Sequence, residues 1–343
     1  MKITFFDTHQ FDKDAFLAAN EKFNFEIEFQ EARLNAKSAR LALDSNIVCS
    51  FVNDKIDDDC IGNLKTLGVE LIALRSAGFN HVDLISAAKY EILVVRVPAY
   101  SPHAVAEYAT GLLLSLNRNI HRAYIRVREF NFSLDGLVGF NLYKKTIGII
   151  GVGKIGKIFA QLMASFGCNV LLNDINKDSG LENHPKIQYT DLSTLYRQSD
   201  VISLHLPLTP ETYHLIDHAS IDKMKTGVMI INTGRGALIN SKALIEGLKN
   251  RKIGGAALDV YEEEDNLFFR DLSNKILQDD ILARLLTFPN VLVTSHQAFL
   301  TKESLQNIAN TTLESIDEFN KTKTVAKEKI VNAKCCLKGT QNE

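Results

Sequence analysis

A glycine-rich stretch near the middle of the chain decides the fold: residues 147–156 read Ile-Gly-Ile-Ile-Gly-Val-Gly-Lys-Ile-Gly. Its apolar beginning is typical of a buried strand, and its last three glycines have the G-x-G-x-x-G spacing of a strand-to-helix turn. In such a turn Gly151 permits the tight bend, Gly153 lets the backbone approach a pyrophosphate, and Gly156 lets the helix pack closely on the strand. The helix N-terminus then offers unpaired N–H groups to phosphate.

An acidic residue follows this fingerprint at a suitable distance. Asp174 lies 18 residues after Gly156, where the next apolar run ends. A carboxylate there can accept hydrogen bonds from the ribose of adenosine, and its charge would repel a 2′-phosphate. The pattern therefore predicts a dinucleotide site and favours NAD over NADP. A structural turn or another nucleotide-like ligand is the alternative, and the nearby Lys177 blurs the choice of cofactor.

Strand-like apolar runs alternate with helix-length connections on both sides of the fingerprint. This alternation predicts parallel sheets covered by helices, in two doubly wound α/β domains: a Rossmann-like coenzyme domain and a flavodoxin-like substrate domain with a cleft between them. The predicted strands are residues 3–6, 47–52, 71–74 and 92–97 in the first series, and 146–150, 170–173, 201–206, 228–232, 256–260 and 291–294 in the second.

Two connections indicate where the domains divide. Ser101 can cap a helix whose first residue is Pro102, and the stretch from there to about Glu129 predicts one long helix that is apolar on several faces. Residues 302–319 are helical again, with no strand left to pair, so we expect them to return to the first domain. The prediction is a discontinuous substrate domain, 1–100 and 300–343, and an NAD-binding domain, 101–299.

Length, composition and charge exclude several classes of protein. The chain has 343 residues, 45% hydrophobic and 23% charged, which is enough for more than one core. A formal net charge of −2 offers no basic field to nucleic acid, and no apolar run approaches the roughly 20 residues that cross a bilayer. The five cysteines show no C-x-x-C spacing. We expect a cytoplasmic protein without metal, nucleic-acid or membrane partners, and a mobile polar tail, 321–343, that holds Cys335 and Cys336.

Three strand ends of the second series carry polar side chains that suit one reaction. They are Asn232 to Gly236, Leu258 to Glu264, and Thr294 to Phe299. In a doubly wound sheet ligands bind outside the carboxyl ends of the strands, so all three segments point toward one site. Arg235 offers a planar fork for a carboxylate, His296 titrates near neutral pH, and a nearby Glu264 would fix the tautomer of the histidine. A 2-oxo acid reductase needs these groups.

Each of these residues, taken singly, also has an ordinary structural interpretation. An arginine such as Arg235 is more often a surface turn residue, and Glu264 sits in an acidic run that would normally be solvated. A histidine such as His296 can be a hydrogen-bonded core residue. His205, at another strand end among apolar residues, is expected to pack or to face the cofactor and not to act as the acid.

Several longer motifs are similar to those of one family. They are Phe51-Val52-Asn53, Arg75-Ser76-Ala77-Gly78-Phe79-Asn80, Val97-Pro98-Ala99-Tyr100-Ser101-Pro102, Ser203-Leu204-His205-Leu206-Pro207-Leu208-Thr209, Asn232-Thr233-Gly234-Arg235-Gly236-Ala237-Leu238, Asp259-Val260-Tyr261-Glu262 and His296-Gln297-Ala298-Phe299. With the glycine fingerprint, they resemble the D-2-hydroxyacid dehydrogenase family over roughly residues 1–319, and within it the fermentative D-lactate dehydrogenases. The resemblance implies reduction of pyruvate to D-lactate by NADH.

The resemblance also implies a substrate role for each matching position. Arg235 would hold the substrate carboxylate, His296 would donate a proton to the oxo group, and Glu264 would partner the histidine. The other implied substrate contacts are the backbone of Ser76, Ala77 and Gly78, Tyr100 beside the carboxylate, and Phe51 and Phe299 around a methyl-sized side chain.

The cofactor contacts come from the fingerprint and from the resemblance together. They are Gly151, Gly153, Lys154, Ile155, Gly156, Asp174, Leu206, Pro207, Thr212, Thr233, Gly234, Arg235 and Asp259, the last near the nicotinamide amide. Thr212 stands where many relatives carry Asn, and we expect this difference to weaken one hydrogen bond to the cofactor without abolishing binding.

Two alternatives to this function stay open. One is a reductase of the same family for another 2-oxo acid, such as hydroxypyruvate, phenylpyruvate or 2-oxoisocaproate. The other is a non-catalytic NADH sensor, similar to transcriptional corepressors that resemble the family and can keep the same three residues; the lack of an obvious basic localisation run argues against it. The resemblance further implies a homodimer or homotetramer, joined through the helix after Ser101.

Overall fold

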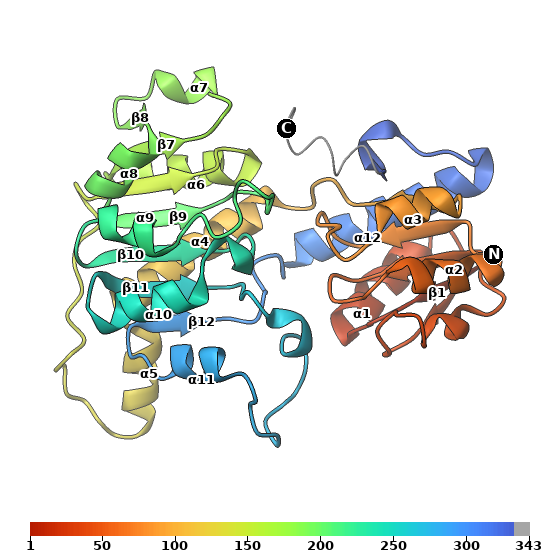
Figure 1. Ribbon diagram of the computed structural model, residues 1–343, viewed down its shortest axis with the longest axis horizontal. Coiled ribbons are helices and arrows are strands. Elements are labelled where there is room, and N and C mark those ends of the chain that lie inside the picture. The colour runs from red at the N-terminus through yellow and green to blue at the C-terminus, as the bar shows by residue number, and fades with distance from the viewer. Residues whose placement is uncertain (333–343) are drawn as a thin grey trace. The chain divides into compact units, whose positions relative to one another are not determined.

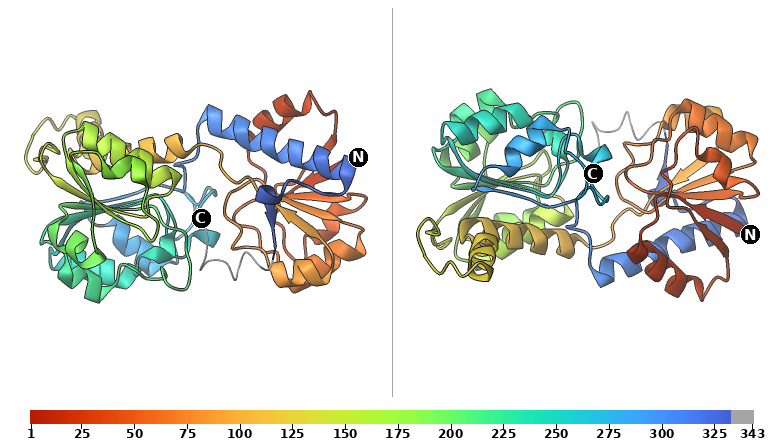
Figure 2. Two further views of the ribbon diagram at one scale, coloured as in Figure 1. Left: turned by 90° about the horizontal axis from the view of Figure 1, so that it is seen from above. Right: turned by 90° about the horizontal axis from the view of Figure 1, so that it is seen from below.

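The computed structural model describes residues 1–332 and divides them into two compact units (Figure 1). The first unit is Met1–Ser101 together with the described residues from Leu300 on, and the second is Pro102–Phe299. Each unit has a central sheet with helices on both of its faces (Figure 2). Cys335 and Cys336 lie outside the described residues.

The sheet of the first unit has six strands in the order β13-β5-β4-β3-β1-β2. Neighbouring strands are parallel except for β13, which pairs antiparallel with β5. The strands are β1 (Lys2–Phe5), β2 (Glu26–Phe29), β3 (Ile47–Ser50), β4 (Leu71–Leu74), β5 (Leu93–Val95) and β13 (Ile330–Val331). The helices are α1 (Gln10–Asn20), α2 (Asp58–Thr66), α3 (Leu84–Lys89) and α12 (Lys302–Thr322), with 3-10 turns at Ala39–Ala42 and Lys327–Lys329.

The core of the first unit forms where strands are covered on both faces. Every residue of β3 and β4 is buried, which explains why these strands are apolar except for Ser50 and do not alternate. Aspartates start two of the covering helices: Asp57 accepts a hydrogen bond from Cys60 N, and Asp83 accepts bonds from Ile85 N and Ser86 N. α12 packs on α1, so a segment from the end of the chain completes this unit.

The sheet of the second unit has seven parallel strands in the order β12-β11-β10-β9-β6-β7-β8. The strand order reverses between β6 and β9, which is where ligands bind in doubly wound sheets. The strands are β6 (Thr146–Ile150), β7 (Asn169–Asn173), β8 (Ile187–Tyr189), β9 (Val201–Leu204), β10 (Val228–Asn232), β11 (Ile253–Leu258) and β12 (Val291–Val293). The helices are α4 (Pro102–Asn117), α5 (Ile120–Arg128), α6 (Lys154–Ser165), α7 (Ser179–Glu182), α8 (Leu192–Gln198), α9 (His218–Lys223), α10 (Ser241–Lys249) and α11 (Asp280–Leu286), with 3-10 turns at Gly236–Leu238 and Glu264–Asn266.

The predicted fold class of two doubly wound α/β units is confirmed, and α4 begins at Pro102 as predicted. The single long helix predicted up to Glu129 is wrong. The helix ends at Asn117 and a second one starts at Ile120, because Asn119 between them takes a left-handed conformation with φ of 51°. Asparagine adopts this conformation more easily than most residues, and it interrupts the helical hydrogen bonds there.

The end of the described chain also differs from the prediction. The sequence predicts a mobile polar tail from residue 321 on, yet Ile330 and Val331 form β13 beside Val95 and Val94 of β5. A two-residue strand gives no periodic signal, and its partner lies more than 230 residues earlier in the chain. Across residues 1–332, no helix combines the length and the apolar character that crossing a bilayer requires.

Candidate functional site

The glycine fingerprint forms the turn between β6 and α6. Gly151 has a φ of +91°, and a Cβ on it would lie 2.6 Å from the His205 carbonyl oxygen. A Cβ on Gly156 would lie 2.0 Å from the Gly151 carbonyl oxygen, so only glycine lets α6 pack this closely. Gly153 is the N-cap of α6, and a Cβ there would meet nothing within 4 Å. The space beside Gly153 at the helix N-terminus is therefore open, as the approach of a pyrophosphate requires.

Asp174 lies directly after β7 and accepts a hydrogen bond from the glycine turn. One carboxylate oxygen accepts a hydrogen bond from Val152 N at 2.5 Å, and the other accepts one from Asn176 N at 2.8 Å. Each carboxylate oxygen has a second lone pair, so the side chain can still accept hydrogen bonds from ribose hydroxyls.

Replacing Asp174 with alanine should change the preference between cofactors. We expect kcat/KM with NADH to fall and that with NADPH to rise, so that their ratio shifts by about 10- to 100-fold, because a ribose hydrogen bond and a charge repulsion are both lost. Steady-state kinetics with both cofactors measure this ratio. Asp200→Ala is the matched control, because Asp200 accepts a bond from Thr146 N at the opposite end of β6. An unchanged ratio in Asp174→Ala would contradict the assignment.

Other residues predicted to contact the cofactor lie in the loops that follow β9 and β10. The Thr233 hydroxyl is buried and has no hydrogen-bond partner in the described structure, so a bound ligand can supply one. The Thr212 hydroxyl, in contrast, donates to Pro207 O at 2.7 Å and accepts from Thr209 N at 2.8 Å. It is held inside its own turn together with Pro207. The residues of the glycine turn and the orphaned Thr233 hydroxyl fit a dinucleotide.

His205 packs against the glycine turn. Its Nε2 lies 2.9 Å from Ser203 Oγ, and its ring lies 5.1 Å from that of Phe159 on α6. Burial lowers its pKa to about 4, so it is neutral at physiological pH. Its carbonyl oxygen abuts Gly151. These contacts make His205 a packing residue and not a proton donor.

An imidazole–carboxylate pair stands beyond β11 and β12. His296 Nδ1 lies 2.6 Å from Glu264 Oε1, and Glu264 Oε2 accepts a hydrogen bond from Tyr261 N at 2.9 Å. Both side chains are largely buried. The contact at Nδ1 leaves Nε2 of His296 without a partner among the described residues, so this nitrogen can exchange a proton with a substrate.

A buried aspartate builds the turn that holds His296. Asp259 is fully buried; its carboxylate accepts hydrogen bonds from Thr294 Oγ1 at 2.6 Å, Gln297 N at 2.9 Å and Ala298 N at 2.8 Å. Its carbonyl oxygen accepts a bond from His296 N at 2.7 Å. Burial raises the pKa of Asp259, and these donors oppose the shift. The resemblance implies a contact with the nicotinamide amide. Oδ1 of Asp259 accepts two bonds inside the histidine turn and Oδ2 accepts one, so Oδ2 keeps a lone pair for such a contact.

Arg235 lies in the loop after β10, which Asn232 holds from one side. Asn232 Oδ1 accepts a bond from Gly234 N at 3.0 Å, and Asn232 Nδ2 donates to Arg235 O at 2.8 Å. The half-buried guanidinium donates to Gly234 O at 2.8 Å and has no acidic partner within residues 1–332. Its remaining donors are available for a carboxylate.

The three catalytic candidates belong to loops at one edge of one sheet. Strands β10, β11 and β12 are adjacent and parallel, with Asn232 beside Leu258 and Leu258 beside Val293. Glu264 and His296 are in direct contact, and the Arg235 loop follows the neighbouring strand. Glu264 and His296 are therefore in contact, and Arg235 lies at the same edge of the sheet.

In the first unit, the predicted substrate contacts also follow carboxyl ends of strands. Phe51 comes after β3, Ser76 to Gly78 after β4, and Tyr100 after β5. The Ser76 hydroxyl donates to Gly78 O at 2.8 Å, which shapes this short turn. Phe299, the other aromatic candidate, is buried and ends the second unit.

Two charged residues to which the sequence analysis assigned no role contact Phe51. Arg75 is fully buried, donates to the Asp7 carbonyl oxygen at 2.6 Å and pairs with Asp12, and its guanidinium lies 4.6 Å from the centre of the Phe51 ring. Asp54 accepts a bond from Phe51 N at 2.8 Å, and burial raises its pKa to about 6. The Asp at the third position after Phe51 is a turn signal that could have revealed this contact.

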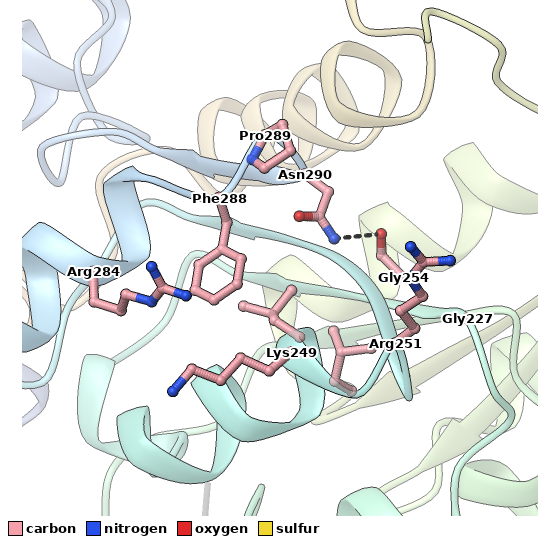
Figure 3. A pocket seen from close by; sticks show the side chains of 10 residues that line it. Gly227, Lys249, Arg251, Gly254, Arg284, Phe288, Pro289 and Asn290 are labelled. Carbon is pink, nitrogen blue, oxygen red and sulfur yellow. Dashed lines mark hydrogen bonds between the residues drawn. The ribbon is translucent and has the colours of Figure 1, made fainter.

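A cavity of about 610 Å³ opens at the opposite edge of the second unit's sheet, where β10, β11 and β12 begin (Figure 3). Its basic residues include Lys249 and Arg284, which lie in the last turns of α10 and α11. Cations at these positions offset the partial negative charge of a helix C-terminus, so a structural role explains them. Within the described residues, no group of three or more His, Cys, Asp or Glu side chains could hold a metal ion.

A glycine turn, an acidic residue directly after the next strand and a histidine–glutamate pair at the same sheet's carboxyl edge define a dinucleotide-dependent oxidoreductase. Residues 110–298 match the model of the D-isomer specific 2-hydroxyacid dehydrogenase NAD-binding domain. The chain therefore belongs to the D-isomer specific 2-hydroxyacid dehydrogenase family. The family resemblance, the enzyme class and NAD as cofactor, all predicted from the sequence, are confirmed.

Relatives and a solved structure support this assignment over nearly the whole chain. The sequence is 50% identical over 328 residues to the D-lactate dehydrogenase of Escherichia coli strain K12, covering 96% of this chain and 99% of the relative. It is 51% identical over 320 residues to 2-hydroxyacid dehydrogenase homolog 1 of Schizosaccharomyces pombe, covering 93% and 96%. The apo-structure of the E. coli D-lactate dehydrogenase matches with a TM-score of 0.87 at 48% identity, covering 95% of this chain and 98% of that one.

Proposed function

We propose that this enzyme reduces pyruvate to D-lactate with NADH. The observation that carries the proposal is the contact between His296 and Glu264, which leaves Nε2 of the histidine available at the sheet edge that carries Arg235. The 50% identity to a D-lactate dehydrogenase supports pyruvate as the substrate. Family membership alone would also allow hydroxypyruvate, phenylpyruvate or 2-oxoisocaproate.

In the proposed reaction the three residues have different roles. The Arg235 guanidinium binds the substrate carboxylate through paired hydrogen bonds and fixes the orientation of the adjacent oxo group. Bound NADH supplies the hydride that reduces the oxo carbon. Protonated His296 donates the proton from Nε2 to the oxo oxygen, and Glu264 holds the ring through Nδ1 and stabilises its charged form. The product is a 2-hydroxy acid, and the imidazole is left neutral.

Chiral analysis of the product tests this proposal directly. Purified enzyme with pyruvate and NADH should form D-lactate, and kcat/KM for pyruvate should exceed the values for hydroxypyruvate, phenylpyruvate and 2-oxoisocaproate. L-lactate as the product, or a preference for a bulky acid, would refute the assignment. Tight NADH binding without oxidation by any of these acids would favour the sensor alternative.

We also propose that the enzyme regenerates NAD during fermentation in the cytoplasm. The three cysteines of the described chain, Cys49, Cys60 and Cys168, are buried free thiols, which is typical of a reducing compartment. Burial raises the pKa of each of these thiols, so they stay protonated and unreactive at neutral pH.

We propose in addition that the enzyme is a homo-oligomer whose interface includes residues 120–143, here called the apolar arm. The arm comprises α5 and the segment leading to β6, and in Figure 1 it extends beyond the sheet of its own unit. Its exposed apolar residues are Ile120, Tyr124, Ile125, Val127, Phe130, Phe132, Leu134, Val138 and Tyr143. So many large apolar side chains on one segment are unusual for a monomer, and a second copy would cover them.

Introducing charged residues into the apolar arm should dissociate the homo-oligomer into monomers. Phe130 and Val138 are 84% and 91% exposed, so replacing both with aspartate should leave the fold intact while it opposes burial in an interface. Light scattering should show a multiple of 38.3 kDa for the wild type and 38.3 kDa for the double variant. Ile85→Asp, on the exposed side of α3, is the control and should leave the mass unchanged. A monomeric wild type would contradict the proposal.

A further inference from the structure

A second imidazole–carboxylate pair lies in the second unit, next to the first. His214 Nε2 and Glu262 Oε1 are 2.5 Å apart, and both side chains are mostly buried. Glu262 stands on the same loop as Glu264, two residues earlier. His214 comes from a different part of the chain, the segment between β9 and α9. Neither residue was singled out as functional in the sequence.

The neighbours of His214 determine how its ring is protonated. Asn240 caps α10, and its Oδ1 accepts a hydrogen bond from Ala243 N at 2.9 Å, so its Nδ2 group must face His214 Nδ1, 3.2 Å away. Nδ1 therefore accepts a bond and Nε2 donates to Glu262. His296 uses only Nδ1 in its own pair, whereas His214 uses both ring nitrogens. It has none left for a substrate, which rules out a role as an acid or base.

The second pair encloses the segment that carries Arg235. His214 N donates to Ala237 O at 2.8 Å, and Glu262 Oε2 accepts a bond from Ser241 Oγ at 2.9 Å. Between them Gly236 lies so close to the Glu262 loop that a Cβ on it would be 2.0 Å from the Tyr261 carbonyl carbon. The Arg235 segment is thus pressed against the loop that also presents Glu264.

We propose that His214 and Glu262 are positioning residues that hold the Arg235 loop in a fixed place relative to the Glu264–His296 pair. The inference rests on the proposed function, in which Arg235 binds the substrate carboxylate. Asn232 holds the amino-terminal side of the Arg235 segment, and the second pair holds its carboxyl-terminal side. Loss of the pair would let the guanidinium move while the Glu264–His296 contact stays intact.

His214→Phe is the test variant, because it removes both side-chain hydrogen bonds and keeps an aromatic ring to stack on Tyr213, whose ring centre is 3.9 Å from that of His214. We expect KM for pyruvate to rise about tenfold while kcat falls less than about threefold, since carboxylate binding weakens and proton transfer does not. The dissociation constant of NADH should change less than KM for pyruvate, because the glycine turn and Asp174 lie at other strand ends and are not affected. His218→Phe, which breaks the exposed pair with Glu246, is the control and should keep wild-type kinetics.

Hydrogen exchange of the apo enzyme gives a second readout that does not depend on the substrate. Backbone amides of residues 238–241 should exchange faster in His214→Phe than in the wild type and in His218→Phe. Unchanged exchange overturns the positioning role, and so does faster exchange with an unchanged KM or with a loss confined to kcat. If the wild type reduces no pyruvate, the proposed function fails, while the exchange rates still decide whether the pair holds the loop.

Discussion

Replacing His296 with glutamine should lower kcat for pyruvate reduction by about 10²- to 10⁴-fold, the range expected when a general acid is removed. Glutamine can still form a hydrogen bond with Glu264, but it has no ionisable proton to donate to the oxo oxygen. NADH binding should be unaffected, because the glycine turn and Asp174 lie at other strand ends of the sheet. Stopped-flow or steady-state oxidation of NADH measures the rate, and NADH fluorescence measures binding.

Glu264→Gln should have a smaller effect of the same kind. An amide at this position can keep the contact with His296 Nδ1 but does not stabilise the charged ring, so we expect a loss of about 10- to 100-fold. A larger loss of kcat in His296→Gln than in Glu264→Gln would identify His296 as the proton donor and Glu264 as its partner. A His296→Gln enzyme within tenfold of wild-type kcat would show that another group supplies the proton.

The elements predicted correctly from the sequence are those that carry their own signal. The run 147–156 indicates a strand, a turn and a helix through its apolar residues and its glycine spacing. β3 and β4 are apolar except for Ser50, because both of their faces are covered. Besides β13, two further edge strands were missed, β2 and β8. They span four and three residues and contain exposed polar side chains, so only their pairing with β1 and β7 makes them strands.

In the site, too, contacts that follow from the order of the strands could be predicted from the sequence, whereas contacts that depend on the tertiary structure could not. Strand ends in a parallel sheet meet at one edge, so the contact between Glu264 and His296 could be inferred from the order of the strands. The pairing of His214 with Glu262 could not, since 48 residues separate them and the acidic run 262–265 suggests a solvated surface. The support that Arg75 gives Phe51 depends on the register of β3 and β4, which no local pattern states.

Replacing Arg235 with glutamine should raise KM for pyruvate by about 10²- to 10³-fold, because a charge-assisted, two-point contact with the carboxylate is lost. kcat should fall as well, since the guanidinium also orients the oxo group for hydride and proton transfer. This combined effect distinguishes Arg235→Gln from His214→Phe, which should act mainly on KM. Arg235→Lys should be intermediate, because an ammonium keeps the charge but not the planar fork.

Arg251→Gln is the matched control, because Arg251 lines the cavity at the opposite edge of the same sheet and has no assigned function. It should leave KM and kcat for pyruvate unchanged, which would show that the effect at position 235 is local and does not follow from the loss of any surface cation. A pyruvate KM in Arg235→Gln within threefold of the wild type would mean that the carboxylate is bound elsewhere. The backbone groups of Ser76 to Gly78 would then be the remaining candidates for that contact.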